Sequence, residues 1–298
     1  MQALPWVTVI CLCYNQQDYV LETLNSVLAQ SYKNIEIIIV DDFSTDNSVK
    51  VIERWLIKNP NVLFIKNDRN LGNTKSFNLA VHKSKGSFLI DLACDDLLFE
   101  NTVKSQISNI LQTDLDHTAF IYANAINIDQ KGDFISYFFP VDSNKKVLKK
   151  RNSGNIYSEI LAGGSSICSV TALHNRKIFE KLDGYDETLF YEDLDYWIRA
   201  SRTYKIYYTD EIWVKKRYLK NSLGASFAKK DLFAHKLSIS TYYILKKALK
   251  LNQSKTEDTA LLKRIHYELH QNTKKGEYLL LIKLLLLKTK LHLLTLCR

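Results

Sequence analysis

Short apolar runs alternate with helix-like patterns through about the first 125 residues, and this alternation restricts the fold more than any other feature. Four runs have the length and apolar content of buried strands: residues 7–13, 35–40, 62–65 and 87–92. Apolar residues at helical spacing follow each of the first three runs. Short turns between such units favour parallel pairing and right-handed crossovers. The sequence therefore predicts a mostly parallel α/β sheet with helices on both faces.

Polar side chains follow each predicted strand at the point where it ends. They are Tyr14-Asn15, Asp41-Asp42, residues 67–70 and Asp95-Asp96. In open parallel sheets, ligands bind beyond the carboxyl ends of the strands. Two adjacent carboxylates such as Asp95 and Asp96 indicate a cation, a hydrogen-bonding ligand or open solvent, because ionised carboxylates repel and are costly to bury. A solvated turn with a helix cap explains an isolated pair, but four polar turns on one rim favour a ligand site.

The region from residue 126 to about 228 is less regular. Residues 163–166 form a predicted flexible turn, and a helix is predicted to open near Tyr191, with Leu194 among its core positions. Three acids stand at its start: Glu192, Asp193 and Asp195. Acids in a first turn complement the helix dipole, which explains one of these residues but hardly all three.

The order of these motifs resembles glycosyltransferase family 2 over roughly residues 5–225. The matching segments are Val7–Asn15, Ser26–Tyr32, Glu36–Asp46, Asn70–Gly72, Asp95-Asp96, Gly184–Glu187, and Glu192-Asp193 followed by Trp197 and Arg199. The resemblance implies a GT-A fold and an inverting, metal-dependent enzyme that uses nucleotide-diphospho-sugars. It also implies a nucleotide-sugar-binding half at residues 1–125 and an acceptor-binding, catalytic half at residues 126–228.

The resemblance also implies roles for the residues on the rim. Asp42 would pair with the nucleotide base, usually uracil, and Arg69 would help to bind the donor. The backbone and side chains of Cys13, Tyr14 and Asn15 would line the same pocket. A carboxylate can accept the imide N–H of uracil, so a site built around it rejects bases without that group. The alternative for Asp41 and Asp42 is a turn with an Asx cap.

Asp95 and Asp96 would take the family's DxD role. Asp95 would contact the ribose and Asp96 would hold Mn²⁺ or Mg²⁺, with Asp95 as a second metal ligand; such ions need only one or two carboxylates besides substrate phosphates. The family's usual first Asp falls at Ala93. Asp91 lies on the same strand face as Ala93 by period two, and its part in the site is open.

On the acceptor side, the resemblance implies that Asp193 is the general base and that Glu192 orients it or contacts the acceptor. Gly164 and Ser165 would belong to an acceptor-side loop, although a plain flexible turn is as good an interpretation. A diphosphate-binding His is missing from residues 217–222, so Arg217 or Lys220 would neutralise the phosphates. Residues 221–228 could form a lid, and a solvated basic loop is the alternative for this segment.

The net charge of +9 is unevenly distributed: residues before Lys215 sum to −5 and the remainder to +14. Residues 229–298 are predicted to form a basic helical extension that ends in a leucine-rich, lysine-containing segment. Lys283 and Lys290 share one face there and Lys288 lies nearly opposite. An anionic membrane surface is one partner for this extension. Packing against the body, or against a second copy in a homo-oligomer, is the alternative.

Composition narrows the remaining choices. Five cysteines without a CxxC pair indicate neither a disulfide framework nor a thiolate zinc site. The sequence has neither a signal-like start nor a spanning apolar run, so we expect a cytoplasmic protein, with peripheral attachment to the cytoplasmic membrane face as an alternative.

The predicted function is transfer of a sugar from a UDP-sugar to a hydroxyl of a cell-surface glycan or lipid-linked acceptor. A metal-dependent nucleotidyl- or phosphotransferase is the rival enzyme, but it leaves Glu192-Asp193 unexplained. The non-enzyme rival is a basic nucleic-acid-binding module. The body of the chain is acidic, so we expect no nucleic-acid partner.

Overall fold

Four parallel strands form the nucleotide half of the sheet. The computed structural model describes residues 4–163, 167–219, 226–227 and 229–297. Strands β1 (Val7–Cys13), β2 (Ile35–Asp41), β3 (Leu63–Lys66) and β4 (Phe88–Ala93) lie in the order β3-β2-β1-β4. All three neighbouring pairs are parallel, with Val7 opposite both Ile35 and Phe88. Strand order reverses between β1 and β4, and ligands bind at such switch points in open α/β sheets.

The other half of the sheet mixes strand directions. It continues through β8 (Leu173–Asn175), β6 (Thr118–Ile128), β9 (Lys205–Arg217) and β5 (Leu97–Leu98), and β7 (Phe134–Tyr137) pairs with β6. β8 is antiparallel to β4 and β6, whereas β6 and β9 run parallel. The mostly parallel α/β sheet is confirmed, and its antiparallel pairs lie in the half whose sequence pattern is less regular.

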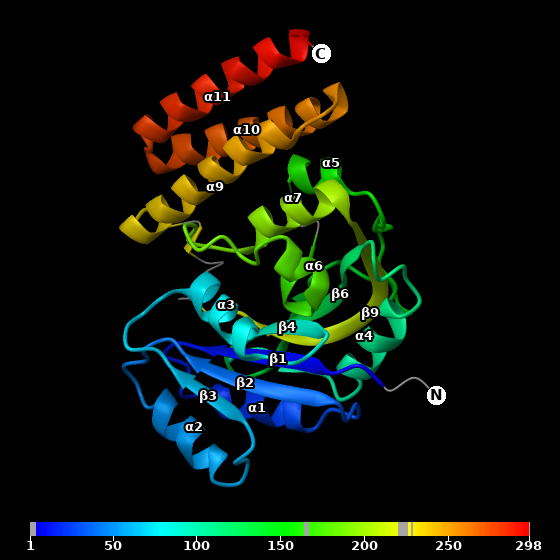
Figure 1. Ribbon diagram of the computed structural model, residues 1–298. Helices are drawn as coiled ribbons and strands as arrows, with labels where there is room; N and C mark the ends of the chain where they lie inside the picture. The colour runs from blue at the N-terminus through cyan, green and yellow to red at the C-terminus, as the bar shows by residue number, and fades with distance from the viewer. Residues whose placement is uncertain (1–3, 164–166, 220–225, 228, 298) are drawn as a thin grey trace.

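Helices cover the sheet on both faces (Figure 1). α1 (Val20–Leu28) and α2 (Ser48–Leu56) connect strands that advance from β1 to β3, and α3 (Asn73–Lys83) leads back to β4. With right-handed crossovers, the reversal places α3 on the face opposite α1 and α2. α4 (Thr102–Ile110), α5 (Tyr157–Ala162), η1 (Ser169–Thr171), α6 (Arg176–Lys181) and α7 (Asp193–Thr203) complete the body. Fully buried large side chains at its centre include Phe77, Phe120 and Trp213.

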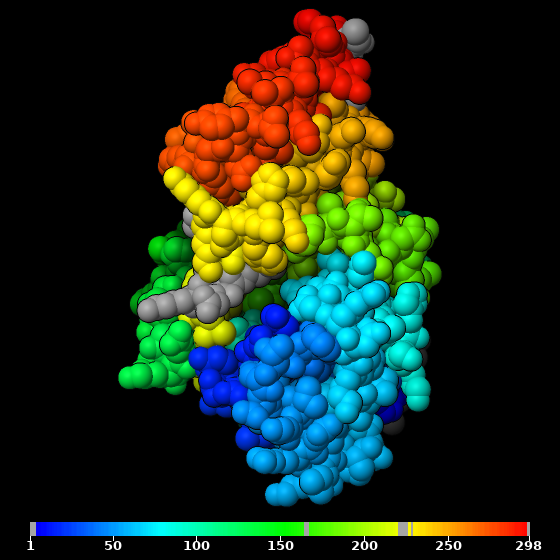
Figure 2. Space-filling view, turned by 90° about the vertical axis from the view of Figure 1, so that its left-hand side faces the viewer, coloured from blue at the N-terminus to red at the C-terminus, as the bar shows by residue number. Residues whose placement is uncertain are grey.

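Three long helices form the C-terminal extension, as predicted. α9 (Leu232–Leu251) begins with an Asp231 cap, and α10 (Lys255–Lys275) begins with a Ser254–Glu257 capping box. α10 packs against α5, α9 packs against α7, and α11 (Tyr278–Cys297) packs on α10 and α9 as the outermost helix (Figures 1 and 2). The extension therefore packs against the body. None of the described helices is both long and apolar enough to cross a membrane.

Candidate active site

The polar turns predicted from the sequence meet at one rim of the sheet. The Asp42 backbone N–H donates to the Cys13 carbonyl at 2.8 Å, and the Cys94 N–H donates to the Leu12 carbonyl at 2.9 Å. These bonds continue the β1–β2 and β1–β4 ladders past the strand ends. The ends of β1, β2 and β4 are thereby held side by side at the switch point.

Asp42 organises the turn that precedes α3. Its Oδ1 accepts hydrogen bonds from the Asn67 amide at 2.8 Å and the Leu71 N–H at 2.7 Å. Oδ1 also accepts from the Ser76 hydroxyl at 3.1 Å, and Oδ2 accepts from the Gly72 N–H at 2.8 Å. A carboxylate offers about four acceptor positions, so most of this capacity is used within the protein. Gly72 has φ 83°, a conformation that glycine adopts readily.

The neighbouring pocket residues differ in what they offer a ligand. Asp41 is buried, and its Oδ1 accepts no hydrogen bond from any described residue, whereas Oδ2 accepts from the Ser44 N–H at 2.9 Å. Asn15 is exposed at φ 53° and its Oδ1 accepts from the Thr45 N–H at 2.7 Å. The Tyr14 ring is half exposed. Asp41, Asn15 and Tyr14 therefore present groups at the rim.

Two other predicted donor-site residues, Cys13 and Arg69, differ in their exposure to solvent. The Cys13 side chain is buried in the core, and its backbone carbonyl accepts the Asp42 N–H at the rim. That the Cys13 side chain lines the pocket stays a prediction. By strand parity Cys13 shares one side of β1 with Val9 and Cys11, and both sides of this strand are buried. Arg69 lies exposed in the turn before α3.

Asp95 and Asp96 are both buried just after β4. Asp96 Oδ1 accepts the Arg217 N–H at 2.7 Å, and Gln16 hydrogen-bonds to the Asp95 carboxylate. Burial and the neighbouring Asp95 charge raise the pKa of the Asp96 carboxyl to about 8, and burial also raises the pKa of Asp95. Two adjacent carboxylates with raised pKa values form a site that is short of positive charge.

Arg217 braces this pair from β9. Its Nε donates to the Asp95 carbonyl at 3.0 Å, and one Nη pairs with Glu22 at 2.8 Å. The other Nη donates to the carbonyls of residues 129–130 at 3.2 and 3.0 Å. The side chain is only 2% exposed. Because the guanidinium is occupied by protein acceptors, this geometry favours a positioning role over contact with a diphosphate.

Lys216 is a site residue that was not predicted from the sequence. Its positive charge lowers the pKa of Asp95, Asp96 and Asp193, so it lies near both acidic groups of the rim. The ammonium also lies 5.2 Å from the centre of the Phe138 ring. No sequence signal identified Lys216, because its position depends on the pairing of β9 with β6.

A second acidic cluster surrounds the start of α7. Ser169 hydrogen-bonds to Asp193, and burial raises the pKa of Asp193 to about 6. Burial, with the charges of Asp193 and Asp91, raises the pKa of Glu192, whose Oε2 has no partner among the described residues. Asp91, left open by the sequence, joins this cluster: Tyr185 hydrogen-bonds to it, and burial together with Asp193 raises its pKa to about 7.

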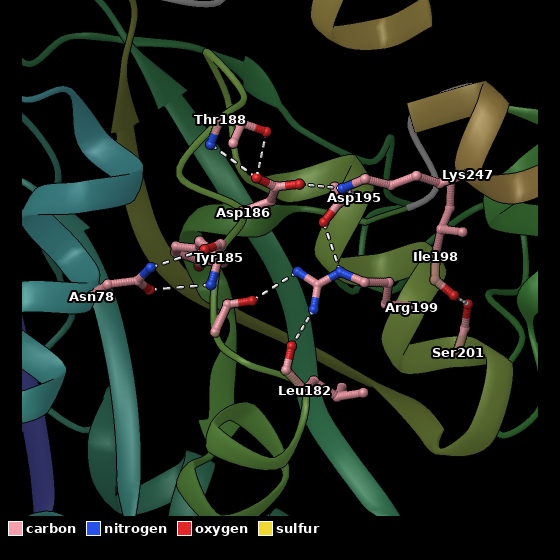
Figure 3. A network of polar contacts seen from close by, with 11 residues as sticks. Asn78, Leu182, Tyr185, Asp186, Thr188, Asp195, Ile198, Arg199, Ser201 and Lys247 are labelled. Carbon is pink, nitrogen blue, oxygen red and sulfur yellow. Dashed lines mark hydrogen bonds and ion pairs between the residues drawn. The ribbon is translucent and has the colours of Figure 1, made fainter. Parts of the chain in front are cut away.

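Behind this cluster, salt bridges fix α7 in place (Figure 3). Asp195 Oδ2 pairs with Arg199 Nε at 2.7 Å, and Asp195 Oδ1 pairs with Lys247 Nζ of α9 at 2.7 Å. Arg199 also donates to the Gly184 carbonyl at 2.7 Å, and Lys247 pairs with Asp186. Arg199 is therefore an ion-pair partner, as the sequence indicated.

A cavity of about 610 Å³ adjoins these salt bridges. Its lining includes Asn78, His82, Tyr185, Asp186, Arg199 and Lys247. None of the rim carboxylates lines it, so we place the chemistry at the rim and not in this cavity. Three predicted site residues, Gly164, Ser165 and Lys220, lie outside the described residues, as does most of the predicted lid.

The acidic pair suits a divalent cation that the donor helps to bind. Among the described residues no group of three or more His, Cys, Asp or Glu side chains could hold a metal by itself. Mg²⁺ and similar ions often bind through one or two carboxylates, with substrate phosphates completing the shell. Asp95 and Asp96, with their raised pKa values, match that requirement.

Comparison with known proteins identifies the family of the chain. The model of glycosyl transferase family 2 matches residues 8–182. An uncharacterized glycosyltransferase from Rickettsia typhi is 31% identical over 72% of this chain and 64% of its own length. Another, from Methanocaldococcus jannaschii, is 29% identical over 81% of this chain and 79% of its own length. The chain belongs to glycosyltransferase family 2. It covers only 30% to 64% of the length of the first five curated relatives.

Solved structures show the same fold. TarS of S. aureus, in complex with UDP-GlcNAc, superposes with a TM-score of 0.63 at 17% identity over 90% of this chain and 73% of that chain. The mannosyltransferase PcManGT from Pyrobaculum calidifontis, in complex with GDP-Man and Mn²⁺, gives 0.58 at 16% identity over 99% and 84%. The fold is therefore the GT-A fold.

Proposed function

We propose that this glycosyltransferase moves a sugar from a UDP-sugar, with inversion, to a hydroxyl of a cell-surface glycan or lipid-linked acceptor. The observation that carries the proposal is that one cation, Lys216, influences both acidic groups: the Asp95–Asp96 pair and Asp193. This shared influence supports assigning the two groups to a single site. The Asp95–Asp96 pair could hold a metal ion at the donor diphosphate, and Asp193 could act as the general base.

At the base end of the donor, the proposal uses the turn after β2. Asp42 keeps its proposed role of pairing with uracil, through capacity on Oδ2, which accepts a single hydrogen bond from the described residues. Asp41 Oδ1, which is buried and unpartnered among those residues, is a second acceptor at the same turn. Leaving a buried acceptor without a donor destabilises the complex, so a base that supplies an N–H is favoured. The complexes of TarS with UDP-GlcNAc and of PcManGT with GDP-Man support a nucleotide-sugar donor.

At the diphosphate end, Asp96 and Asp95 would hold Mn²⁺ or Mg²⁺, and Asp95 would also contact the ribose. A bound divalent cation stabilises negative charge on a leaving diphosphate. Lys216 would add a fixed positive charge at the same place. Arg217 keeps Asp96 aligned through its backbone N–H, and Lys220 remains a proposed phosphate contact.

On the acceptor side, Asp193 would take the proton from the attacking hydroxyl. Inversion requires this carboxylate to face the sugar from the side opposite the diphosphate. A pKa of about 6 leaves Asp193 mostly ionised at neutral pH, yet basic enough to accept a proton. Glu192, whose pKa is raised by burial and by the neighbouring charges of Asp193 and Asp91, would orient Asp193 or contact the acceptor. Gly164 and Ser165 remain proposed acceptor contacts.

A donor panel tests this function. Purified protein would be incubated with UDP- and GDP-sugars and Mn²⁺, Mg²⁺ or EDTA, and release of nucleoside diphosphate would be measured. We expect release from a UDP-sugar that requires the divalent ion and is lost in Asp96→Ala and Asp193→Asn. Asp133→Asn, on the exposed turn before β7, is the matched control. Release that both site variants retain would rule out this mechanism.

A further inference from the structure

The outermost helix, α11, is apolar on two opposite faces. Leu280, Leu284, Leu287 and Leu291 are buried, and their spacing places them on one side of the helix. A second stripe lies on the opposite side: Leu279, Ile282, Leu286 and Leu293. Leu279, Leu286 and Leu293 are 78%, 66% and 61% exposed. The helix therefore uses one face for packing and presents the other to its surroundings.

The lysines of α11 lie along the two boundaries between these faces. At 3.6 residues per turn, Lys283 and Lys290 fall on one boundary and Lys288 falls on the other. The Lys283 ammonium is 5.9 Å from the ring centre of Tyr242 on α9, so the first boundary faces α9. The lysines that do not share one face of the helical wheel therefore lie in a regular pattern once the buried face is known. The exposed stripe is bordered by positive charge on both sides.

Acidic side chains do not offset this charge. Residues 278–297 contain no Asp or Glu. The acids of α10 and its flanks are engaged inside the protein: Glu257 pairs with Arg202, Glu268 with Arg264, and Glu277 with His235. Asp258 accepts a hydrogen bond from Thr295 of α11 itself. The outer side of α11 therefore combines apolar surface with uncompensated positive charge.

We propose that the outer face of α11 docks onto the surface of an anionic lipid bilayer, with the helix lying in the plane of the interface. An exposed leucine stripe inserts into the acyl boundary, and flanking lysines meet anionic headgroups. Lysine stems suit this place because they lie along apolar surface while the ammonium stays at the polar level. The inference concerns attachment alone and does not depend on the donor or the acceptor.

A second copy of the chain fits this face less well. Pairing two α11 helices through their leucine stripes would bring lysine boundaries together, and the helix carries no acid to pair with them. Like charges at such a seam oppose association. An anionic lipid surface can bury the leucine stripe and pair with the lysines on both sides of it, so the charge pattern favours lipid.

Vesicle co-sedimentation of the full chain tests the proposal. The vesicles would contain phosphatidylcholine alone or phosphatidylcholine mixed with phosphatidylglycerol. We expect binding to the mixed vesicles only, and weaker binding at high salt. Removing three lysines in Lys283→Gln/Lys288→Gln/Lys290→Gln should reduce partitioning by about a hundredfold, because each lysine near an anionic surface contributes about fivefold. Leu279→Ser/Leu286→Ser/Leu293→Ser should reduce it by about tenfold or more.

Matched controls distinguish a loss of membrane attachment from a loss of folding and from a change in net charge. Lys58→Gln/Lys104→Gln/Lys131→Gln removes the same charge from exposed positions on the body and should bind vesicles nearly as wild type. Thermal unfolding should be almost unchanged in both α11 variants, since the altered leucines are exposed. Wild-type protein that ignores the mixed vesicles, or a leucine variant that binds them equally well, overturns the proposal. So does a wild-type dimer, seen by light scattering, that the leucine variant dissociates while neither protein binds vesicles.

Discussion

Lys247 Nζ on α9 lies 2.7 Å from Asp195 Oδ1 on α7, two residues after the proposed base Asp193. The Asp195 side chain is 2% exposed, so its charge depends on partners supplied by the protein. Lys247 also pairs with Asp186, in the segment that precedes α7. The C-terminal extension thus contributes directly to holding α7 in position.

Lys247→Met should therefore destabilise the protein and lower turnover. Removing one partner of a buried ion pair leaves a charge without compensation, but Arg199 still faces Asp195. We expect a loss of about 1–3 kcal/mol in the free energy of unfolding, measured by urea denaturation. Lys246→Met, at the exposed neighbouring position, is the control. Equal stability of the two variants would show that the bridge contributes nothing.

The pKa of Asp193 predicts how activity depends on pH. Burial raises this pKa to about 6, and a general base must be ionised to accept a proton. Below pH 6 the rate should therefore fall about tenfold per pH unit, and above about pH 7 it should level off. In Asp193→Asn, kcat should drop by about 10²–10⁴-fold and the acid limb should vanish. The measurement is kcat/KM for nucleoside diphosphate release across pH; an unchanged limb in the variant would assign it to another group.

The raised pKa of Asp91 predicts that this residue's contribution to the free energy of unfolding falls as pH rises, which is opposite to the usual loss of stability in acid. Burial and Asp193 raise its pKa to about 7, from 3.8, so between these values the folded state binds more protons than the unfolded state. Its contribution to stability is then fully present below about pH 4 and is lost as pH rises towards 7. Asp91→Asn removes this loss. The variant should gain stability over wild type as pH rises from 4 to 7, measured as the difference in melting temperature, and a pH-independent difference would contradict the shift.

Much of the nucleotide half could be predicted from the sequence because its contacts are local. The predicted strand at residues 7–13 matches β1, and the run at 87–92 differs from β4 by one residue at each end. β1, β2 and β3 pair in sequence order and β4 returns to the other side of β1, through short connections that periodicity and turn chemistry specify. The rim at Asp42 and Asp96 followed from the same reasoning.

The rest depends on pairings between distant segments. Lys216 enters the site only because β9 runs beside β6, which lies far away in the sequence. Asp91 could be placed on a strand face, but its partner Tyr185 belongs to a segment that periodicity does not position. For α11 the sequence did not identify the partner. Apolar residues on two opposite faces of a helix give little net amphipathicity, and only the packing shows which face is buried.

Lys216 provides the sharpest test that the two acidic groups form one site. Lys216→Met removes a positive charge from both groups, so the donor KM should rise by about 10–100-fold, as expected when a charged partner worth about 1.5–3 kcal/mol is lost. Because Lys216 lowers the pKa of Asp193, the acid limb of the rate profile should also move to higher pH. Lys216→Arg should restore part of both effects. Lys215→Met is the matched control, since its ammonium lies 5.5 Å from the Phe99 ring centre on the opposite strand face. A Lys216→Met variant that raises KM without moving the acid limb would place Lys216 at the diphosphate end alone and separate the two acidic groups.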